Sequence, residues 1–263
     1  MDWRQLSTSF LPKVYYSIFS KQCSICQSHS QTAVCKYCKV GFEHNRHACS
    51  VCQRPLSQQQ IAQQQIAQHA SQQSLCGKCQ VAPPPYYRCL APLRYEGTTR
   101  ILIQNIKFHQ QAHFIQPLME IVRDHLVTYY SQNAPWPNQI VFVPSHPQRI
   151  KERGFCQTQI MVNTLHSLLK STLTSDLPYI ATRNPIHKSV HTQAQHTLSR
   201  KLRIQNQQGV YQVQGPIEEH VALFDDVMTT GSTLESCTKA LQRKGAKRVD
   251  IWVIARTPDD KHG

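Results

Sequence analysis

The stretch that decides the fold is VALFDDVMTTGST, residues 221–233. It begins as a continuous apolar strand, passes two adjacent carboxylates, Asp225 and Asp226, and ends in a loop of hydroxyl side chains around one glycine. In open α/β sheets, ligands bind at the carboxyl ends of the strands. The acid pair and the loop follow a buried strand directly, and they therefore predict a binding site at the edge of a sheet.

The chemistry of this loop indicates the ligand. Backbone amides that lead into a helix N-terminus cradle a phosphate, hydroxyl groups add donors, and Gly231 permits close approach of the backbone. Two carboxylates at the strand end can accept hydrogen bonds from vicinal ribose hydroxyls. We therefore assign Asp225 and Asp226 to a ribose, and the following residues to its 5-phosphate: Thr229, Thr230, Gly231, Ser232 and Thr233. The alternative is a structural strand end with a capped helix, in which adjacent buried carboxylates would be costly without partners.

Outward from this stretch, helical and strand patterns alternate. Strands are predicted at 88–95, 139–143, 179–183, 210–213, 220–227 and 248–255, and helices at 99–108, 114–130, 155–170 and 232–245. Continuous apolar strands separated by helices are typical of a mainly parallel sheet that is covered on both faces. The predicted fold class is therefore α/β.

Two polar segments accompany the predicted site. Arg149, Lys151 and Arg153 follow the strand at 139–143, where a second anion could bind, because guanidinium groups pair well with phosphate oxygens. A pyrophosphate there and a 5-phosphate at 229–233 would together describe phosphoribosyl pyrophosphate. The alternative is a solvated basic loop. The stretch 184–203 is either a mobile lid over the anomeric carbon or a plain loop.

Cysteines dominate the first part of the chain. Eight of the eleven form four C-x-x-C pairs: Cys23/Cys26, Cys35/Cys38, Cys49/Cys52 and Cys76/Cys79. Two such pairs complete a closed tetrahedral shell around a structural zinc ion, so the eight thiols predict two zinc ions, with a single zinc as the alternative. The short spacing between the first two pairs favours sequential pairing, in which first joins second and third joins fourth, over a cross-brace.

The chain is expected to divide into two domains. Residues 1–82 form the zinc-binding module, with a glutamine-rich polar insertion at 57–73, and residues 86–263 form the α/β domain. The intervening prolines, 83–85, stiffen the connection. A cysteine-rich segment this small buries too little apolar surface to fold without metal.

Composition limits the classes of function. The formal net charge is +14, and it stays at about +10 when eight thiolates bind two zinc ions, which favours an anionic partner such as nucleic acid. No apolar run reaches the roughly 18 residues that a membrane span needs. The N-terminus makes a poor signal peptide, since Asp2 replaces a basic region and Pro12 interrupts the apolar stretch. A reducing cytoplasm is therefore the expected compartment.

The acid pair and its loop resemble the type I phosphoribosyltransferases, whose apolar strand, two acidic residues and TTG-type loop bind ribose 5-phosphate. Three further segments, 143–159, 192–211 and 106–111, together with the cysteine pairs, are similar to the ComF family, known also by its GntX members. Members of this family are competence-associated proteins that join N-terminal zinc ribbons to a phosphoribosyltransferase-like domain. The resemblance implies the same organisation here.

The resemblance also implies roles for individual residues. VPSHPQRIKERGFCQTQ matches the family stretch, except that Cys156 stands where asparagine is usual, and the lysine–aromatic turn IKFHQQ lacks its usual glycine. The second-anion set then contains Ser145, His146, Arg149, Lys151, Arg153 and Lys107. The flexible loop contains Gln195, Arg200 and Arg203, and Tyr211 fits the end of the same family pattern.

Two functions are compatible with this sequence. In the first, the chain is a binding protein of DNA uptake and natural transformation, whose pocket holds a ribose 5-phosphate, a phosphoribosyl pyrophosphate or single-stranded DNA, with a DNA-processing protein as a further partner. In the second, it is an active phosphoribosyltransferase that uses phosphoribosyl pyrophosphate with magnesium and releases pyrophosphate. The sequence names no base for that reaction.

Overall fold

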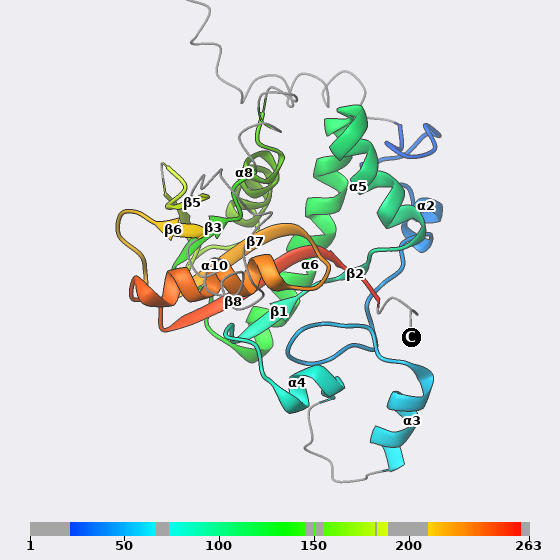
Figure 1. Cartoon of the computed structure of the whole chain (residues 1–263). Helices are drawn as coiled ribbons and strands as arrows, with labels where there is room; N and C mark the ends of the chain where they lie inside the picture. The colour runs from blue at the N-terminus through cyan, green and yellow to red at the C-terminus, as the bar shows by residue number, and fades with distance from the viewer. Residues whose placement is uncertain are drawn as a thin grey trace, which may run out of the picture.

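A mainly parallel β-sheet forms the centre of the molecule (Figure 1). The computed structural model describes residues 22–66, 74–145, 150, 155–181, 183–188 and 210–258. The strand order is β1-β8-β7-β3-β4, β2 also pairs with β8, and all these pairings are parallel. The strands are β1 (Arg88–Leu90), β2 (Leu93–Arg94), β3 (Gln139–Phe142), β4 (Tyr179–Ile180), β7 (His220–Met228) and β8 (Arg248–Arg256). The predicted fold class is confirmed.

Some strands differ from the sequence-based prediction. The strand expected at 88–95 is interrupted at Ala91-Pro92, because proline has no backbone N–H for the ladder, and it appears as β1 and β2. The strand expected at 179–183 shortens to the two residues of β4. β6 (Tyr211–Val213) lies outside the main sheet and pairs antiparallel with β5 (Ile186–Lys188), so the start of the polar stretch 184–203 is a strand and not a loop.

Helices cover both faces of the sheet. On one face lie α5 (Gly97–His109), the short η2 (Ala112–Phe114), α6 (Ile115–Asn133) and α8 (Gln157–Lys170), and on the other lies α10 (Ser232–Arg243). Alternate residues of β7 explain this layering: Ala222 and Phe224 pack with α5, α6 and α8, whereas Val221 and Leu223 pack with α10. Both faces of the strand are buried, as a parallel sheet requires.

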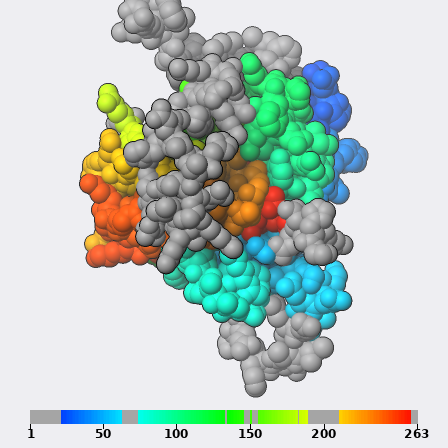
Figure 2. All heavy atoms as spheres, viewed as in Figure 1, coloured from blue at the N-terminus to red at the C-terminus, as the bar shows by residue number. Residues whose placement is uncertain are grey.

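The cysteine-rich segment packs against both faces. Cys23 and Cys35 belong to the apolar cluster of α5, α6 and α8, and Cys49 and Cys76 belong to the cluster of α10. The segment contains α2 (Lys36–Val40), α3 (Gln58–Ile66) and α4 (Gly77–Val81). The space-filling view shows the residues of α4 beside those of α10 on one surface (Figure 2). The module is therefore packed onto the α/β domain from both sides of its sheet.

The described part of the glutamine-rich insertion is helical. α3 covers Gln58–Ile66, and its side chains are mostly exposed up to Ala62. This agrees with the prediction of a polar insertion outside the core. Across the described residues, the structure contains no helix whose length and apolar character would let it cross a bilayer.

Candidate functional site

The carboxyl ends of β3 and β7 meet at one edge of the sheet. Phe142 is paired with Phe224, and the Val143 amide donates to the Phe224 carbonyl at 2.9 Å. The Asn184 side chain holds the end of β3, since its Nδ2 donates to the Phe142 carbonyl at 2.8 Å and its Oδ1 accepts from the Phe142 amide at 3.2 Å. Because the strands run in parallel, Ser145 follows β3 along the same edge that carries the acid pair.

The two carboxylates at the end of β7 differ in their surroundings. Burial and the neighbouring charge of Asp226 raise the pKa of Asp225 to about 8, against smaller opposing effects of the Asp226 amide and Lys107. The amide of Asp226 donates to Asp225 Oδ1 at 2.9 Å. Asp226 instead forms an ion pair, with its Oδ2 2.7 Å from Lys107 Nζ. The raised pKa favours the protonated form of Asp225 at neutral pH, whereas Asp226 is paired with the Lys107 ammonium group.

Lys107 reaches the acid pair from the last turn of α5, which ends where Gln110 adopts a left-handed φ of 55°. The buried Gln157, at the start of α8, fixes this turn by donating from Nε2 to the Ile106 carbonyl at 2.5 Å. The family resemblance assigns Lys107 to the residues that bind the second anion. In this structure its ammonium group instead contacts Asp226, one of the two carboxylates assigned to the ribose. Gln157 lies within the stretch 143–159 that resembles the family, and its contact with α5 shows what it does in this structure.

The loop after β7 has the geometry of an anion cradle. Gly231 caps α10 with a φ of +87°, and a Cβ atom there would lie 2.6 Å from Met228 Cε. The hydroxyl groups of Thr230 and Ser232 are 3.1 Å apart and exposed. The Ser232 amide donates to the Thr230 hydroxyl at 3.4 Å, and the N-terminus of the 12-residue helix α10 favours negative charge.

Tyr211 joins the small β5–β6 hairpin to this loop. Burial raises the pKa of its phenol to about 12, and the phenol contacts the Thr233 hydroxyl. Tyr211 thus remains a neutral hydrogen-bonding group at neutral pH. The hairpin brings the first part of the predicted lid stretch 184–203, as β5, and the strand β6 that follows this stretch to the side of α10.

Four thiols gather at each of two places, and these are the tetrads that sequential pairing predicts. Within each tetrad, Cys23/Cys26/Cys35/Cys38 and Cys49/Cys52/Cys76/Cys79, the sulfur atoms all lie within 4.8 Å of one another. The Sγ atoms of Cys26 and Cys35 are 3.8 Å apart. Those of Cys52 and Cys76 are 3.6 Å apart. Tetrahedral zinc with Zn–S bonds of about 2.3 Å requires sulfurs about 3.8 Å apart, so both tetrads fit a metal ion such as zinc.

The remaining site residues divide into those the structure places and those it does not. Ser145 is half-buried, and its hydroxyl accepts from Cys156 Sγ at 3.5 Å, at the N-terminus of α8. The other predicted residues of the second-anion set and of the flexible loop lie outside the described residues: His146, Arg149, Lys151, Arg153, Gln195, Arg200 and Arg203. Their assignments stay predictions.

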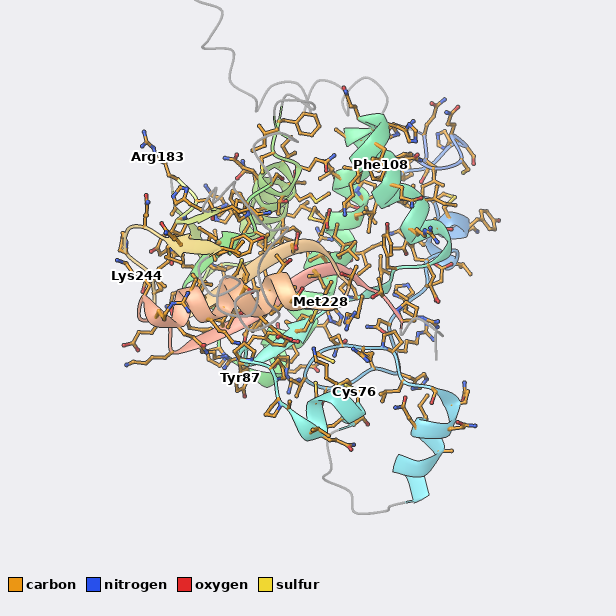
Figure 3. All side chains as sticks on the ribbon, in the orientation of Figure 1. Cys76, Tyr87, Phe108, Arg183, Met228 and Lys244 are labelled. Carbon is orange, nitrogen blue, oxygen red and sulfur yellow. The ribbon has the colours of Figure 1, made fainter. Side chains whose placement is uncertain are left out.

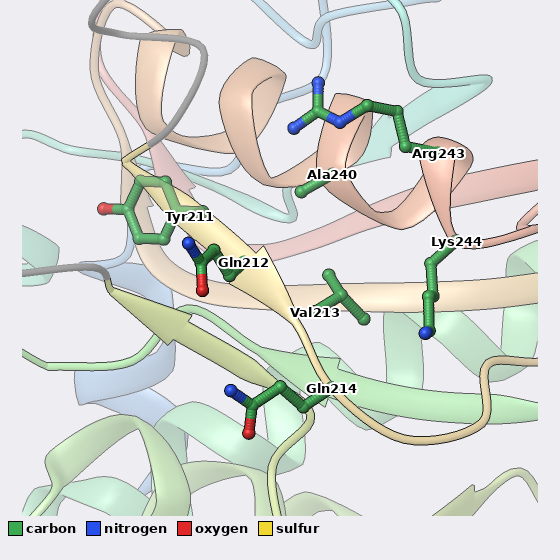
Figure 4. Close-up of a pocket in the computed structure, with 7 residues that line it drawn as sticks. All are labelled: Tyr211, Gln212, Val213, Gln214, Ala240, Arg243 and Lys244. Atoms are coloured by element: carbon green, nitrogen blue, oxygen red, sulfur yellow. The ribbon is translucent and has the colours of Figure 1, made fainter.

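A separate groove lies between β6 and α10, with a volume of about 540 Å³ (Figure 4). Its lining consists of Tyr211, Gln212, Val213, Gln214, Ala240, Arg243 and Lys244. Neither the acid pair nor the loop 229–233 contributes to it. We therefore locate the candidate site by the acid pair and its loop, and not by this groove.

Comparison with known proteins gives named relatives. No protein-family model matches the chain. A DNA utilization protein YhgH of Salmonella typhi is 31% identical over 212 residues, covering 80% of this chain and 90% of the relative. Competence protein F of Haemophilus influenzae is 31% identical over 189 residues, covering 69% of this chain and 78% of the relative.

A hypoxanthine phosphoribosyltransferase structure from Staphylococcus aureus covers 56% of this chain and 74% of its own, at 15% identity and a TM-score of 0.31. A likeness of this size adds nothing to the fold already described.

The mainly parallel sheet, the acid pair with its hydroxyl loop and the two cysteine tetrads define an α/β protein whose N-terminal segment has two sets of thiols that fit a metal ion such as zinc. At 31% identity over 90% of one relative, the chain belongs to the ComF/GntX family, which includes Competence protein F and YhgH.

Proposed function

We propose that this chain is a DNA-utilization protein that binds a 5-phosphorylated ribose between Asp225, Asp226 and the loop 229–233. The observation that carries the proposal is the contrast within the acid pair: Asp226 forms an ion pair with Lys107, whereas the raised pKa of Asp225 favours a carboxyl group that can donate a hydrogen bond. Vicinal ribose hydroxyls each donate and accept, so they suit such a pair. The names of the relatives point to DNA utilization and competence as the process.

The phosphate would bind at the start of α10. Amide groups at this helix N-terminus and the Thr230 and Ser232 hydroxyls converge there. The acidic Glu235 in the first turn is neutralised by Lys78, whose Nζ lies 3.2 Å from its Oε1. This ion pair removes a charge that would repel a phosphate. Single-stranded DNA with a 5′-terminal phosphate would offer the loop the same phosphate group, but its deoxyribose lacks the 2′ hydroxyl that the acid pair would bind.

Zinc is the metal we assign to both tetrads. Four thiolates in a closed tetrahedral shell leave no open position, so the metal would be structural and would take no part in the chemistry of the ligand. In the described residues, these two tetrads are the groups whose donor set suits such a metal. Their sulfurs would be thiolates in the metal-bound protein.

Isothermal titration calorimetry of the zinc-loaded protein with ribose 5-phosphate tests this function. Binding is expected to weaken at least about tenfold, or 1.4 kcal/mol, in Asp225→Asn/Asp226→Asn. Asp124→Asn, an exposed carboxylate on α6 with a side-chain exposure of 68%, is the matched control and should bind as the wild type. Wild-type protein that gives no heat with ribose 5-phosphate or phosphoribosyl pyrophosphate would contradict the proposal.

Binding of single-stranded DNA is measured separately from binding of the sugar phosphate. Fluorescent single-stranded DNA is expected to bind with an affinity that falls steeply with salt, because phosphate contacts release counterions. A flat salt response would exclude an electrostatic DNA contact.

The second candidate function is a phosphoribosyltransferase, which the strand–acid pair–loop arrangement at the sheet edge favours. Pyrophosphate release from phosphoribosyl pyrophosphate, magnesium and a panel of bases would establish it, and no release above the double variant would exclude it for those bases.

A further inference from the structure

Arg256 connects the second cysteine tetrad to the phosphate loop. It is the last residue of β8 and is only 2% exposed. Its Nε donates to the Cys52 carbonyl at 3.2 Å, and its Nη1 donates to the Met228 carbonyl at 2.9 Å and to the Thr229 carbonyl. One guanidinium group therefore binds the backbone of a predicted metal ligand and the first residue of the loop.

The charge of this arginine needs a partner. No ion pair between described residues involves Arg256, and its hydrogen bonds go to carbonyl groups and to the Thr257 hydroxyl. A buried cation without a counter-charge is costly. Four thiolates and one Zn²⁺ carry a net charge of about −2, and the Cys52 carbonyl belongs to that group. A phosphate bound to the loop 229–233 would supply negative charge on the side of the Arg256 guanidinium group that faces away from the tetrad.

Further contacts hold the same two regions together. The Cys89 amide donates to the Val51 carbonyl at 2.7 Å, and Cys89 Sγ lies 3.7 Å from Met228 Sδ. Met228, the last residue of β7, is buried beside α10, and Figure 3 shows it there with Cys76 near α4. The first tetrad belongs to the other apolar cluster, on the opposite face of the sheet. The two tetrads therefore differ in their relation to the loop.

We propose that Arg256 is a positioning residue that couples metal binding at Cys49/Cys52/Cys76/Cys79 to phosphate binding at residues 229–233. The metal centre neutralises the guanidinium group, which in turn holds the carbonyl groups of Met228 and Thr229 so that the loop amides face the ligand. Metal and phosphate then favour each other's binding, since coupling between two sites is reciprocal. The part of this proposal that concerns phosphate binding rests on the proposed function. The part that concerns metal binding does not.

Two substitutions separate the charge of Arg256 from its geometry. Arg256→Lys keeps the cation but has one nitrogen, which cannot reach both Cys52 and the loop carbonyls. Arg256→Met removes the cation as well. Arg248→Lys is the matched control, because Arg248 begins the same strand and donates from Nε to Asp250 Oδ1 at 3.1 Å, at the opposite edge of the sheet.

Zinc release to a colorimetric chelator and the Kd for ribose 5-phosphate are measured on each full-length zinc-loaded variant. Zinc release from the second tetrad is assigned in a Cys26→Ser background, in which the first tetrad lacks a ligand. Arg256→Met is expected to accelerate this release about tenfold, whereas Arg256→Lys releases zinc at nearly the wild-type rate but binds ribose 5-phosphate about tenfold more weakly. Arg248→Lys should change neither.

A measurement on the Cys26→Ser protein with its native Arg256 covers the case in which Arg256→Met fails to fold. Saturating ribose 5-phosphate is expected to slow zinc release from the second tetrad about fivefold or more. Equal release with and without bound ribose 5-phosphate, together with unchanged affinity in Arg256→Lys, overturns the proposal. If ribose 5-phosphate does not bind the wild type, the proposed function fails and the coupling fails with it. The rate of zinc release from Arg256→Met then tests only whether the metal centre and the Arg256 guanidinium group neutralise each other. A rate equal to that of the protein with native Arg256 overturns this part of the proposal as well.

Discussion

The Nζ atom of Lys107 lies 2.7 Å from Oδ2 of Asp226, and this ion pair joins the last turn of α5 to the carboxyl end of β7. The side chains are 24% and 14% exposed. Lys107 therefore pairs with Asp226, while burial and the charge of Asp226 raise the pKa of the neighbouring Asp225 to about 8. The two carboxyl groups of the acid pair thus have different electrostatic surroundings.

Lys107→Met is expected to lower the free energy of unfolding by about 1–2 kcal/mol, because it leaves Asp226 partly buried without its counter-charge. Urea denaturation measures the change. Adding Asp226→Asn to Lys107→Met should recover part of the loss, since no charge is then left unpaired. Strictly additive effects of the two substitutions would mean that the ion pair contributes nothing.

Asp225 should make the stability of the protein depend on pH. Its pKa is raised from 3.8 to about 8 on folding, so the folded state holds the proton more tightly. The resulting stabilisation is full below a pH of about 4 and is lost as the pH rises to about 8, with a slope of up to about 1.4 kcal/mol per pH unit.

Asp225→Asn cannot lose a proton, and it should flatten the urea-denaturation stability curve between pH 5 and 8 and be the more stable form at about pH 8. The exposed Asp124→Asn should leave the curve of the wild type unchanged. Equal slopes for wild type and Asp225→Asn would contradict the raised pKa.

Gly231→Ala tests the shape of the loop against Gly215→Ala. Both glycines have left-handed φ values, +87° and +85°, but only at Gly231 would the new Cβ meet an atom, Met228 Cε at 2.6 Å. Backbone strain at either site costs about 1 kcal/mol, and the steric contact adds to this at Gly231. Only Gly231→Ala should weaken ribose 5-phosphate binding in calorimetry. Equal losses of stability and equal affinities in the two variants would mean that the close approach to Met228 has no effect.

The metal content tests the two tetrads separately. Metal analysis of the purified protein is expected to give about two zinc ions per chain, with one lost in Cys26→Ser and the other in Cys76→Ser. Removing both with a chelator should lower Tm, because the thiol clusters then lose the metal that orders them. Fewer than two zinc ions in the wild type would remove one of the two proposed metal centres.

Local sequence patterns predicted the parts of the site that are continuous in the chain. Asp225, Asp226 and the loop that follows lie within a few residues of one another, so an apolar strand and one glycine were enough to place them. The sequential pairing of the cysteines was also predictable from the short spacing between their first two pairs. The main sheet followed from continuous apolar strands that are buried on both faces.

Contacts between distant residues could not be predicted in this way. Gln157 binds the Ile106 carbonyl, 51 positions away, and Arg256 binds the Cys52 carbonyl, 204 positions away. Carbonyl groups occur at every residue, so no side-chain pattern marks these partners. The β5–β6 hairpin was also missed as a pair, since three-residue strands leave too little alternation to recognise.

A crystal structure of the zinc-loaded protein soaked with ribose 5-phosphate tests the central claim most directly. The account predicts the phosphate within hydrogen-bond distance of the amides of residues 229–233, and the 2′ and 3′ hydroxyls of the ribose on Asp225 and Asp226. A ligand in the groove between β6 and α10, or a Lys107–Asp226 pair that closes the acid pair off from every ligand, would contradict it.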